Sequence, residues 1–262
     1  MRAYELIKEL EQGAFTPNVT CDSVKAGNAE KELKKVAVTM MATIDTVRAA
    51  QKWGADMLIV HEPTYYEHME NFIDAPVVRA KHKLIDDSGL VVYRYHDNMH
   101  YRAEDLITRG MLHSLGLSGK AERTPYFASY IFVADEPVSS LELAKRMENR
   151  LGIKHVRIAG NRDARVTRIG ACFGTPGGVF ELLCSDDVDM ILTGEACEWK
   201  LCEYARDAAA LGMNKSMIVM GHIGSERDGM KMLAESMKEK YEAFETKYFE
   251  CGEVYTYTEE GV

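Results

Sequence analysis

The chain has 262 residues, of which 46% are hydrophobic and 28% charged, a composition ordinary for a globular protein with a core of normal size. Its formal net charge is −9 and it contains no long basic run, so we expect no nucleic-acid binding through a broad basic face. No apolar run is long enough to span a membrane, and the six cysteines include no CxxC pair. Because the charged N-terminal stretch lacks the apolar core of a signal peptide, we expect a cytoplasmic protein with reduced thiols and no membrane partner.

The first half of the chain alternates between helical and strand patterns. Thr43 is expected to cap one of the helices and Gly54 to end it. The patterns predict helices over 2–12, 43–53, 75–88 and 103–115, and strands over 35–41, 56–60 and 90–95.

The second half repeats the alternation. Ser139 and Glu142 form a capping box that predicts a helix beginning there. Strands are predicted over 127–134, 154–158, 166–173, 189–193, 216–220, 246–250 and 253–257, with further helices over 196–211 and 228–240. The glycine-rich loop 174–178 is either a phosphate cradle or a simple turn.

This alternation predicts an α/β fold. A polar, turn-rich stretch at 117–126 suggests two similar α/β halves, residues 1–120 and 121–262, with a metal site between them; one compact domain is the alternative. Each half contains a strand, a helix and a strand that ends in a histidine.

Three apolar runs end in a histidine, namely 55–62 (ADMLIVHE), 90–100 (LVVYRYHDNMH) and 216–226 (SMIVMGHIGSE). Each pattern is typical of a buried strand that carries a metal-type ligand at its carboxyl end, where binding sites form in open α/β sheets. A single histidine after a strand is more often a structural, hydrogen-bonded group. The recurrence at three strand ends favours one shared metal centre.

Each of these histidines has a second donor close by. Glu62 follows His61, and Pro63 favours a turn that lets both side chains face one site. The pairs His96/His100 and His222/Glu226 are four residues apart, which places both members on one side of a helical turn. Asp97 is a further donor, and Glu195 of the TGE segment is either a site residue or a first-turn acid. The remaining histidines are expected to be structural: His68, His82, His113 and His155.

Four segments in this order resemble the Nif-three family (Ngg-one-interacting factor three-like proteins, also called GTP cyclohydrolase I type 2). They are GADMLIVHEP (54–63), HDNMH (96–100), TGE (193–195) and GHIGSE (221–226), which are similar to the family's GAD…HHP, HTxxD, TGE/TGD and GHxxxE motifs. SVKAGN (23–28) is similar to the family's opening D-x-x-G segment.

The resemblance implies two divalent metal ions (zinc, iron or manganese) held by His61, Glu62, His100, His222 and Glu226. Two positions depart from the family pattern, because Glu62 stands for a histidine and His100 for an aspartate. The exchange keeps three histidines and two carboxylates, so metal binding is expected to be retained. A family histidine after TGE is replaced by Trp199.

The favoured function is that of a metal-dependent hydrolase acting on GTP or another nucleotide or phosphoester through a metal-bridging hydroxide. Glu226 is expected to be the bridging catalytic carboxylate, and His96 an outer-sphere group or proton shuttle. The alternative is a non-catalytic metal-binding scaffold or a regulatory assembly. The resemblance implies a homohexamer in both cases.

Overall fold

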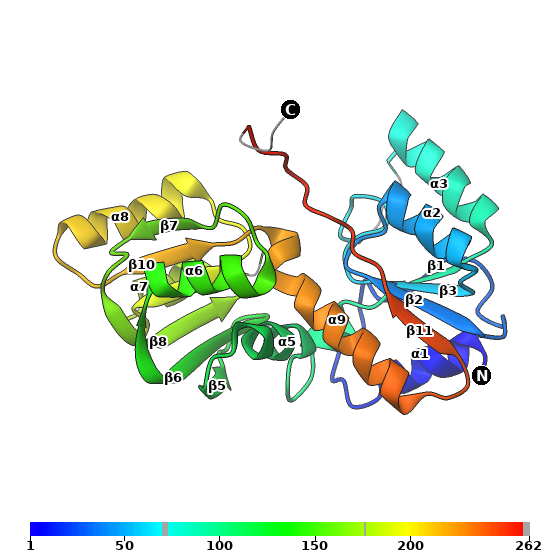
Figure 1. Cartoon of the computed structure of the whole chain (residues 1–262), viewed down its shortest axis with the longest axis horizontal. Helices are drawn as coiled ribbons and strands as arrows, with labels where there is room; N and C mark the ends of the chain where they lie inside the picture. The colour runs from blue at the N-terminus through cyan, green and yellow to red at the C-terminus, as the bar shows by residue number, and fades with distance from the viewer. Residues whose placement is uncertain (70–72, 176, 259–262) are drawn as a thin grey trace. The chain divides into compact units, whose positions relative to one another are not determined.

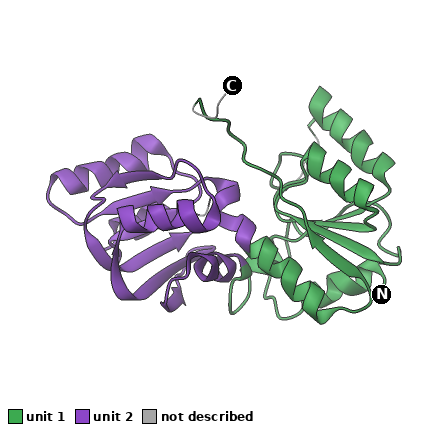
Figure 2. Ribbon diagram, viewed as in Figure 1, with its two compact units in different colours: residues 1–106, 229–262 green, residues 107–228 purple. Residues whose placement is uncertain are grey.

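The computed structural model describes residues 1–69, 73–175 and 177–258. The chain divides into two compact units: unit 1 is Met1–Leu106 with Gly229–Val262, and unit 2 is Ile107–Asp228 (Figure 2). The predicted α/β fold is confirmed, because each unit combines a mixed sheet with helices (Figure 1). The predicted division after residue 120 differs from the one found, since unit 1 ends at Leu106 and the chain returns to it at Gly229.

The sheet of unit 1 has the strand order β1-β4-β3-β2-β11. Its neighbouring strands are parallel except for β1, which pairs antiparallel with β4 at one edge. Pairing of β11 with β2 attaches the C-terminal segment to unit 1, which explains why the unit is discontinuous in sequence. The strands are β1 (Ser23–Ala26), β2 (Lys35–Thr39), β3 (Met57–Val60), β4 (Val91–Arg94) and β11 (Glu245–Tyr248).

Helices cover both faces of this sheet (Figure 1). On one face, Leu58 and Val92 of the sheet belong to the same buried cluster as Val47 of α2 and Ile85 of α3. Burial of such side chains contributes roughly 1.5–3 kcal/mol each. The helices of this part are α1 (Ala3–Glu11), α2 (Ile44–Trp53), α3 (Pro76–Ser88), the short α4 (Asp97–His100) and the unit 1 part of α9 (His222–Lys240).

The sheet of unit 2 has the order β5-β6-β8-β9-β10-β7. Its centre, β8-β9-β10, is parallel, and β7, β6 and β5 pair antiparallel with their neighbours. The parallel arrangement brings the carboxyl ends of β9 and β10 to the same edge. The strands are β5 (Gly119–Arg123), β6 (Ser129–Ser139), β7 (Arg157–Gly160), β8 (Arg165–Cys172), β9 (Met190–Thr193) and β10 (Ser216–Val219).

One face of the unit 2 sheet packs against helices that follow β8 and β9. Leu183 of α7, Ala205 of α8, Ile191 of β9 and Met217 of β10 lie in one buried cluster. The helical elements are α5 (Leu106–Leu115), α6 (Ser140–Leu151), α7 (Val179–Cys184), the π-helix η1 (Glu198–Cys202), α8 (Glu203–Ala210) and the start of α9.

Three helix ends that were predicted from local chemistry are confirmed, the start and end of α2 and the start of α6. The Thr43 side chain accepts a hydrogen bond from the backbone N–H of Thr46, and Gly54 ends α2 in a left-handed conformation. The capping box of Ser139 and Glu142 is present at the start of α6.

Three predictions about elements were wrong. The helix predicted from residue 228 begins at His222, because Gly221 takes a left-handed φ of 84° and lets the chain enter the helix directly after β10. The polar stretch 117–126, predicted to be rich in turns, contains β5, which pairs with β6, and 253–257 contains no strand in its described conformation. Among the described residues, no helix is both long and apolar enough to cross a membrane.

Candidate metal centre

In unit 1, the neighbouring parallel strands β3 and β4 end at the same edge of the sheet, and each is followed closely by a histidine. Val60 of β3 pairs with Arg94 of β4. His61 follows directly, and His96 comes two residues after Arg94. The backbone N–H of Tyr95 donates to the Val60 carbonyl at 2.8 Å, which keeps the two chains together beyond the strands.

The chain turns at His61 and Glu62, as Pro63 led us to expect. The backbone N–H groups of His61 and Glu62 both donate to the carbonyl of Met40, each at 3.1 Å. One acceptor thus holds two consecutive residues, and both side chains are buried. The turn makes it possible for adjacent residues to contribute to one site.

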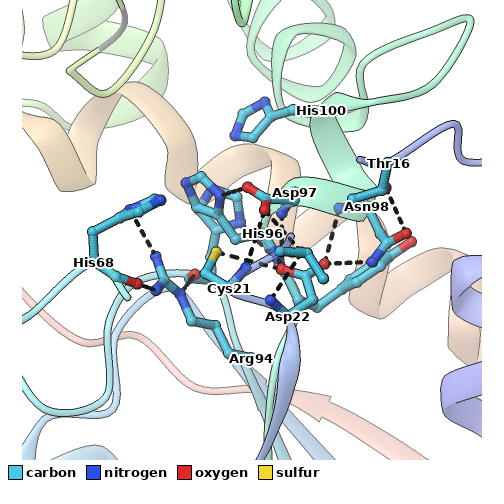
Figure 3. Close-up of polar contacts among 12 residues, drawn as sticks. Thr16, Cys21, Asp22, His68, Arg94, His96, Asp97, Asn98 and His100 are labelled. Carbon is cyan, nitrogen blue, oxygen red and sulfur yellow. Dashed lines mark hydrogen bonds and ion pairs between the residues drawn. The ribbon is translucent and has the colours of Figure 1, made fainter. Parts of the chain in front are cut away.

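A buried aspartate from a distant segment shapes the loop that carries the other two histidines (Figure 3). Asp22 Oδ1 accepts from the backbone N–H of His96 at 2.8 Å and of Asp97 at 2.9 Å, and Oδ2 accepts from that of Asn98 at 2.8 Å. A carboxylate at a helix start satisfies N–H groups that have no partner within the helix. It thereby fixes α4, and α4 places His100 one turn after His96.

The three histidines form a compact, buried cluster. The ring of His61 lies 4.6 Å from that of His96 and 5.2 Å from that of His100, centroid to centroid, and His96 and His100 are 4.9 Å apart. One ring nitrogen of each lies within 4.8 Å of the others. A metal ion bonded to several imidazoles requires such convergence.

Each of the three rings carries its proton on Nδ1. The Nδ1 atoms contact the Tyr95 carbonyl at 3.0 Å (from His61), Asp97 Oδ1 at 2.9 Å (from His96) and Asp105 Oδ2 at 2.7 Å (from His100). Carbonyl and carboxylate oxygens only accept, so Nδ1 is the donor and the lone pair is on Nε2. Metal-binding histidines are held in the same way, so the cluster fits a divalent ion.

Burial and charge keep His61 neutral. Desolvation, followed by the neighbouring His96 and His100, lowers the pKa of His61 well below its ordinary value. A neutral imidazole is the form that binds a metal ion. Burial alone would raise the pKa of Asp97, but hydrogen bonds from His96 and Thr20 outweigh it and lower that pKa. Asp97 is therefore an ionised acceptor for His96.

Glu62 lies between a buried guanidinium and the histidine cluster. Its Oε2 is 3.8 Å from Arg94 Nη2 and its Oε1 is 4.0 Å from His96 Nε2. The Arg94 side chain is fully buried and also donates from Nε to the carbonyl of His61 at 3.0 Å. Arg94 therefore balances the charge of the Glu62 carboxylate.

In unit 2, the ends of β9 and β10 bring a second set of donors together. His222 Nδ1 donates to Glu195 Oε1 at 2.7 Å, and His222 Nε2 lies 3.1 Å from Glu226 Oε2. With the Nδ1 proton directed at Glu195, Nε2 and the Glu226 oxygen face each other as two acceptors unless the ring is charged. A proton or a metal cation there stabilises this pair.

Two glycines let the backbone approach Glu226 and Ser225 closely. At Gly174, whose φ is +65°, an added Cβ would lie 2.5 Å from Glu226 Oε1. At Gly194 it would lie 2.4 Å from Ser225 Oγ, which accepts from the Gly174 N–H at 2.9 Å. Thus the glycine-rich loop supports the proposed metal donor. Its Pro176 lies outside the described residues, so a role in phosphate binding stays a prediction.

A cavity of about 510 Å³ in unit 2 adjoins this pair. Its lining includes Thr175 and Glu195, both of which contact His222 Nδ1, at 3.3 and 2.7 Å. Its lining also includes Phe180 and Lys200, and the Lys200 ammonium lies 4.3 Å from the Phe180 ring centroid. Its volume is within the usual range for small-molecule sites.

Within each unit, the residues predicted as metal donors lie together: His61, Glu62 and His100 with His96 in unit 1, and His222 with Glu226 in unit 2. The single dinuclear centre that would use all five donors remains a prediction. Asp22, Arg94 and Asp105 were not predicted. Arg94 could have been recognised as a site residue because it is a charged residue inside the apolar run 90–95. No local sequence feature marks Asp105 as the acceptor for His100.

Comparison with known proteins agrees with the resemblance seen in the sequence. A protein in Pyrococcus horikoshii named GTP cyclohydrolase 1 type 2 homolog is 26% identical over 217 residues, covering 81% of this chain and 82% of that protein. A homolog of the same name in Buchnera aphidicola of Schizaphis graminum is 23% identical over 215 residues, or 81% and 83%.

Solved structures show the same fold. Protein ybgI, described as of unknown function, matches with a TM-score of 0.78 and 23% identity over 96% of this chain and 99% of that one. A Bacillus cereus protein related to NIF3 matches with a TM-score of 0.74 and 12% identity, over 98% and 99% of the two chains.

A family model described as Duf34/NIF3 (NGG1p interacting factor 3) matches residues 21–253, which include every residue predicted above as a metal donor. The chain therefore belongs to the DUF34/NIF3 family.

Proposed function

We propose that this protein binds divalent metal ions and uses them for hydrolysis of a nucleotide or another phosphoester. The observation that carries the metal-binding part is the buried triad of His61, His96 and His100, with each Nδ1 proton directed at a fixed oxygen. Such tautomers present Nε2 lone pairs toward a cation. Zinc, iron and manganese all accept imidazole and carboxylate ligands.

Glu62, His222 and Glu226 add the remaining donors. Glu62 supplies a carboxylate beside the triad, and His222 and Glu226 supply an imidazole and a carboxylate at 3.1 Å in unit 2. When bound, divalent ions supply Lewis acidity and make water acidic enough to react near neutral pH. Glu226, with a side chain 3% exposed, is the carboxylate that we propose to be required for catalysis.

Two alternative roles are open to His96, metal ligand and proton shuttle, and an experiment distinguishes them. As a third ligand it would bond the ion through Nε2. As a proton shuttle, the role expected from the sequence, it would leave metal content unchanged while supporting turnover. His96→Gln therefore loses metal in the first case and only activity in the second.

The cavity beside His222 supports a small-molecule substrate. The Phe180 ring provides an apolar face and Lys200 a positive charge, features that suit an aromatic anion such as a nucleotide. The names of the relatives above make GTP the first compound to test.

The test is a turnover screen with protein loaded with Zn²⁺, Mn²⁺ or Fe²⁺, using GTP, other nucleotides and model phosphoesters. We expect hydrolysis that Glu226→Ala abolishes and that the exposed control Glu235→Ala leaves unchanged. If micromolar loaded protein hydrolyses none of these compounds, the hydrolase proposal fails, while metal content measured on the same samples still tests binding.

One observation favours a second candidate function, a non-catalytic metal-binding scaffold or regulatory homohexamer. Trp199, at the position of the lost family histidine, is 78% exposed on η1. Exposed tryptophans are typical anchors of protein interfaces. Sedimentation of wild type and Trp199→Ala tests this: a hexamer weakened by the substitution supports it, and a monomer in both contradicts it.

A further inference from the structure

A second group of metal-type donors in unit 1 lies outside the histidine triad (Figure 3). Cys21 Sγ, a ring nitrogen of His68 and a carboxylate oxygen of Asp97 all lie within 4.8 Å of one another. Cys21 and Asp97 are buried and His68 is exposed. We propose that these three residues form a separate site for a thiophilic divalent cation such as Zn²⁺, next to the triad.

The donor types match such a cation. Zinc takes cysteine sulfur, histidine nitrogen and aspartate oxygen, and three protein ligands leave a position for water or another small ligand. A thiolate selects soft ions over Mg²⁺, Ca²⁺ and Mn²⁺. The site would therefore differ in metal preference from the triad, which contains only imidazole nitrogens.

The buried donors are held in place by their own hydrogen bonds. Asp97 Oδ2 accepts from Thr20 Oγ1 at 2.8 Å and from the Cys21 backbone N–H at 3.1 Å, and Oδ1 accepts from His96 Nδ1 at 2.9 Å. A carboxylate offers about four acceptor positions, so three hydrogen bonds leave one for a cation. Asp97 thereby connects the new site to His96 of the triad.

Proton and charge balance are consistent with binding. The Cys21 thiol lies 3.7 Å from Asp22 Oδ1; metal binding would replace the thiol proton and release it to solvent. A thiolate, a carboxylate and a neutral imidazole balance the two positive charges of the ion. No oxidation or reduction is involved.

Arg94 restrains His68 without blocking it. Nη1 of Arg94 donates to the His68 carbonyl, and Nη2 lies 3.5 Å from the His68 Nδ1. The second contact is at the long limit for a hydrogen bond, and a metal–nitrogen bond would replace it. Because the His68 ring is exposed, an ion can enter from solvent on its side.

The test is a titration of metal-free, reduced protein with Co²⁺, which gives a near-ultraviolet sulfur-to-cobalt absorption when a thiolate is bound. We expect this absorption in wild type, its loss in Cys21→Ser, and its retention in Cys197→Ser, where the altered thiol is exposed. Absence of the band in wild type, its retention in Cys21→Ser, or its loss in Cys197→Ser would each overturn the proposal.

His68→Ala provides a second variant that alters only an exposed side chain. It should raise the Co²⁺ concentration at half-saturation of the sulfur band by more than about tenfold, since even outer-sphere partners of metal ligands are worth 10–100-fold. An unchanged half-saturation contradicts the proposal. Co²⁺ bound to the histidine triad gives a visible absorption that should be lost in His100→Ala and kept in Cys21→Ser. This absorption tests the metal binding at the triad, proposed above, independently of the Cys21 site.

Discussion

The guanidinium of Arg94 lies 3.8 Å from the carboxylate of Glu62, and the Arg94 side chain is fully buried. The same guanidinium donates to the carbonyls of His61 and His68. Arg94 of β4 thus balances the charge of Glu62. It also hydrogen-bonds to the backbone of the segment that carries His61 and Glu62, two proposed metal ligands. A carboxylate at position 62 is stable in this buried setting because a cation lies next to it.

Replacing Arg94 with Met should therefore destabilise unit 1 strongly. The change removes the cation beside Glu62 and the two hydrogen bonds to the backbone, at a cost of about 3–5 kcal/mol. Urea unfolding monitored by circular dichroism measures this loss in the free energy of unfolding. Glu62→Gln in the same background should recover part of the loss, because the carboxylate charge is removed as well. If the double variant is no more stable than Arg94→Met, the two charges are not coupled.

Asp105→Asn should weaken metal binding without unfolding the protein. The carboxylate accepts from His100 Nδ1 at 2.7 Å and so keeps the lone pair on Nε2. An asparagine can offer an N–H group to Nδ1 and favour the wrong tautomer, and loss of such partners costs about 10–100-fold in affinity. Calorimetric titration with Zn²⁺ measures the change. Asp45→Asn, at a residue with a side chain 95% exposed, is the control and should bind as wild type does.

Glu195→Gln should weaken metal binding in unit 2, as Asp105→Asn should in unit 1. Its carboxylate accepts from His222 Nδ1 at 2.7 Å, so its loss should lower metal affinity at His222 and Glu226 by about 10–100-fold. Equilibrium dialysis with metal analysis gives the affinity. The neighbouring Glu198→Gln removes an acid that is 77% exposed and pairs with Arg157. Equal losses in both variants would indicate a general charge effect instead of orientation of His222.

Cys172 should make stability fall at alkaline pH. Burial raises the pKa of this thiol from 9.0 to about 11. The unfolded chain therefore loses the proton before the folded protein does, so stability is intact below pH 9 and decreases as the pH rises toward 11. The decrease is about 2–3 kcal/mol. Urea midpoints should fall more steeply between these pH values in wild type than in Cys172→Ala, whereas parallel curves would contradict the assignment.

The positions of the histidines could be predicted because they depend on local patterns. Apolar runs such as 57–60 predict strands, and parallel strands deliver the residues that follow them to one edge. His61 and His96 meet for this reason. The four-residue spacing of His222 and Glu226 likewise predicted that both side chains lie on one side of a helical turn, and in the first turn of α9 they are 3.1 Å apart.

The supporting residues could not be predicted because they come from distant segments or irregular loops. Asp22 reaches residues 96–98 across more than 70 positions of sequence, and Asp105 depends on how the chain turns after α4. The domain boundary was missed because the pairing of β11 with β2 leaves no local pattern. The start of α9 was missed because glycine has a low helix propensity, although Gly221, with its left-handed φ of 84°, allows the helix to begin at the next residue.

Anomalous scattering from a crystal grown with Zn²⁺ tests the central claim most directly, because it locates the ion and its ligand distances together. We expect an anomalous peak about 2.0–2.1 Å from imidazole nitrogens of His61 and His100, the usual zinc–nitrogen distance, and its loss in His100→Ala crystals. A crystal that contains zinc elsewhere but shows no peak at the histidine triad would contradict the account.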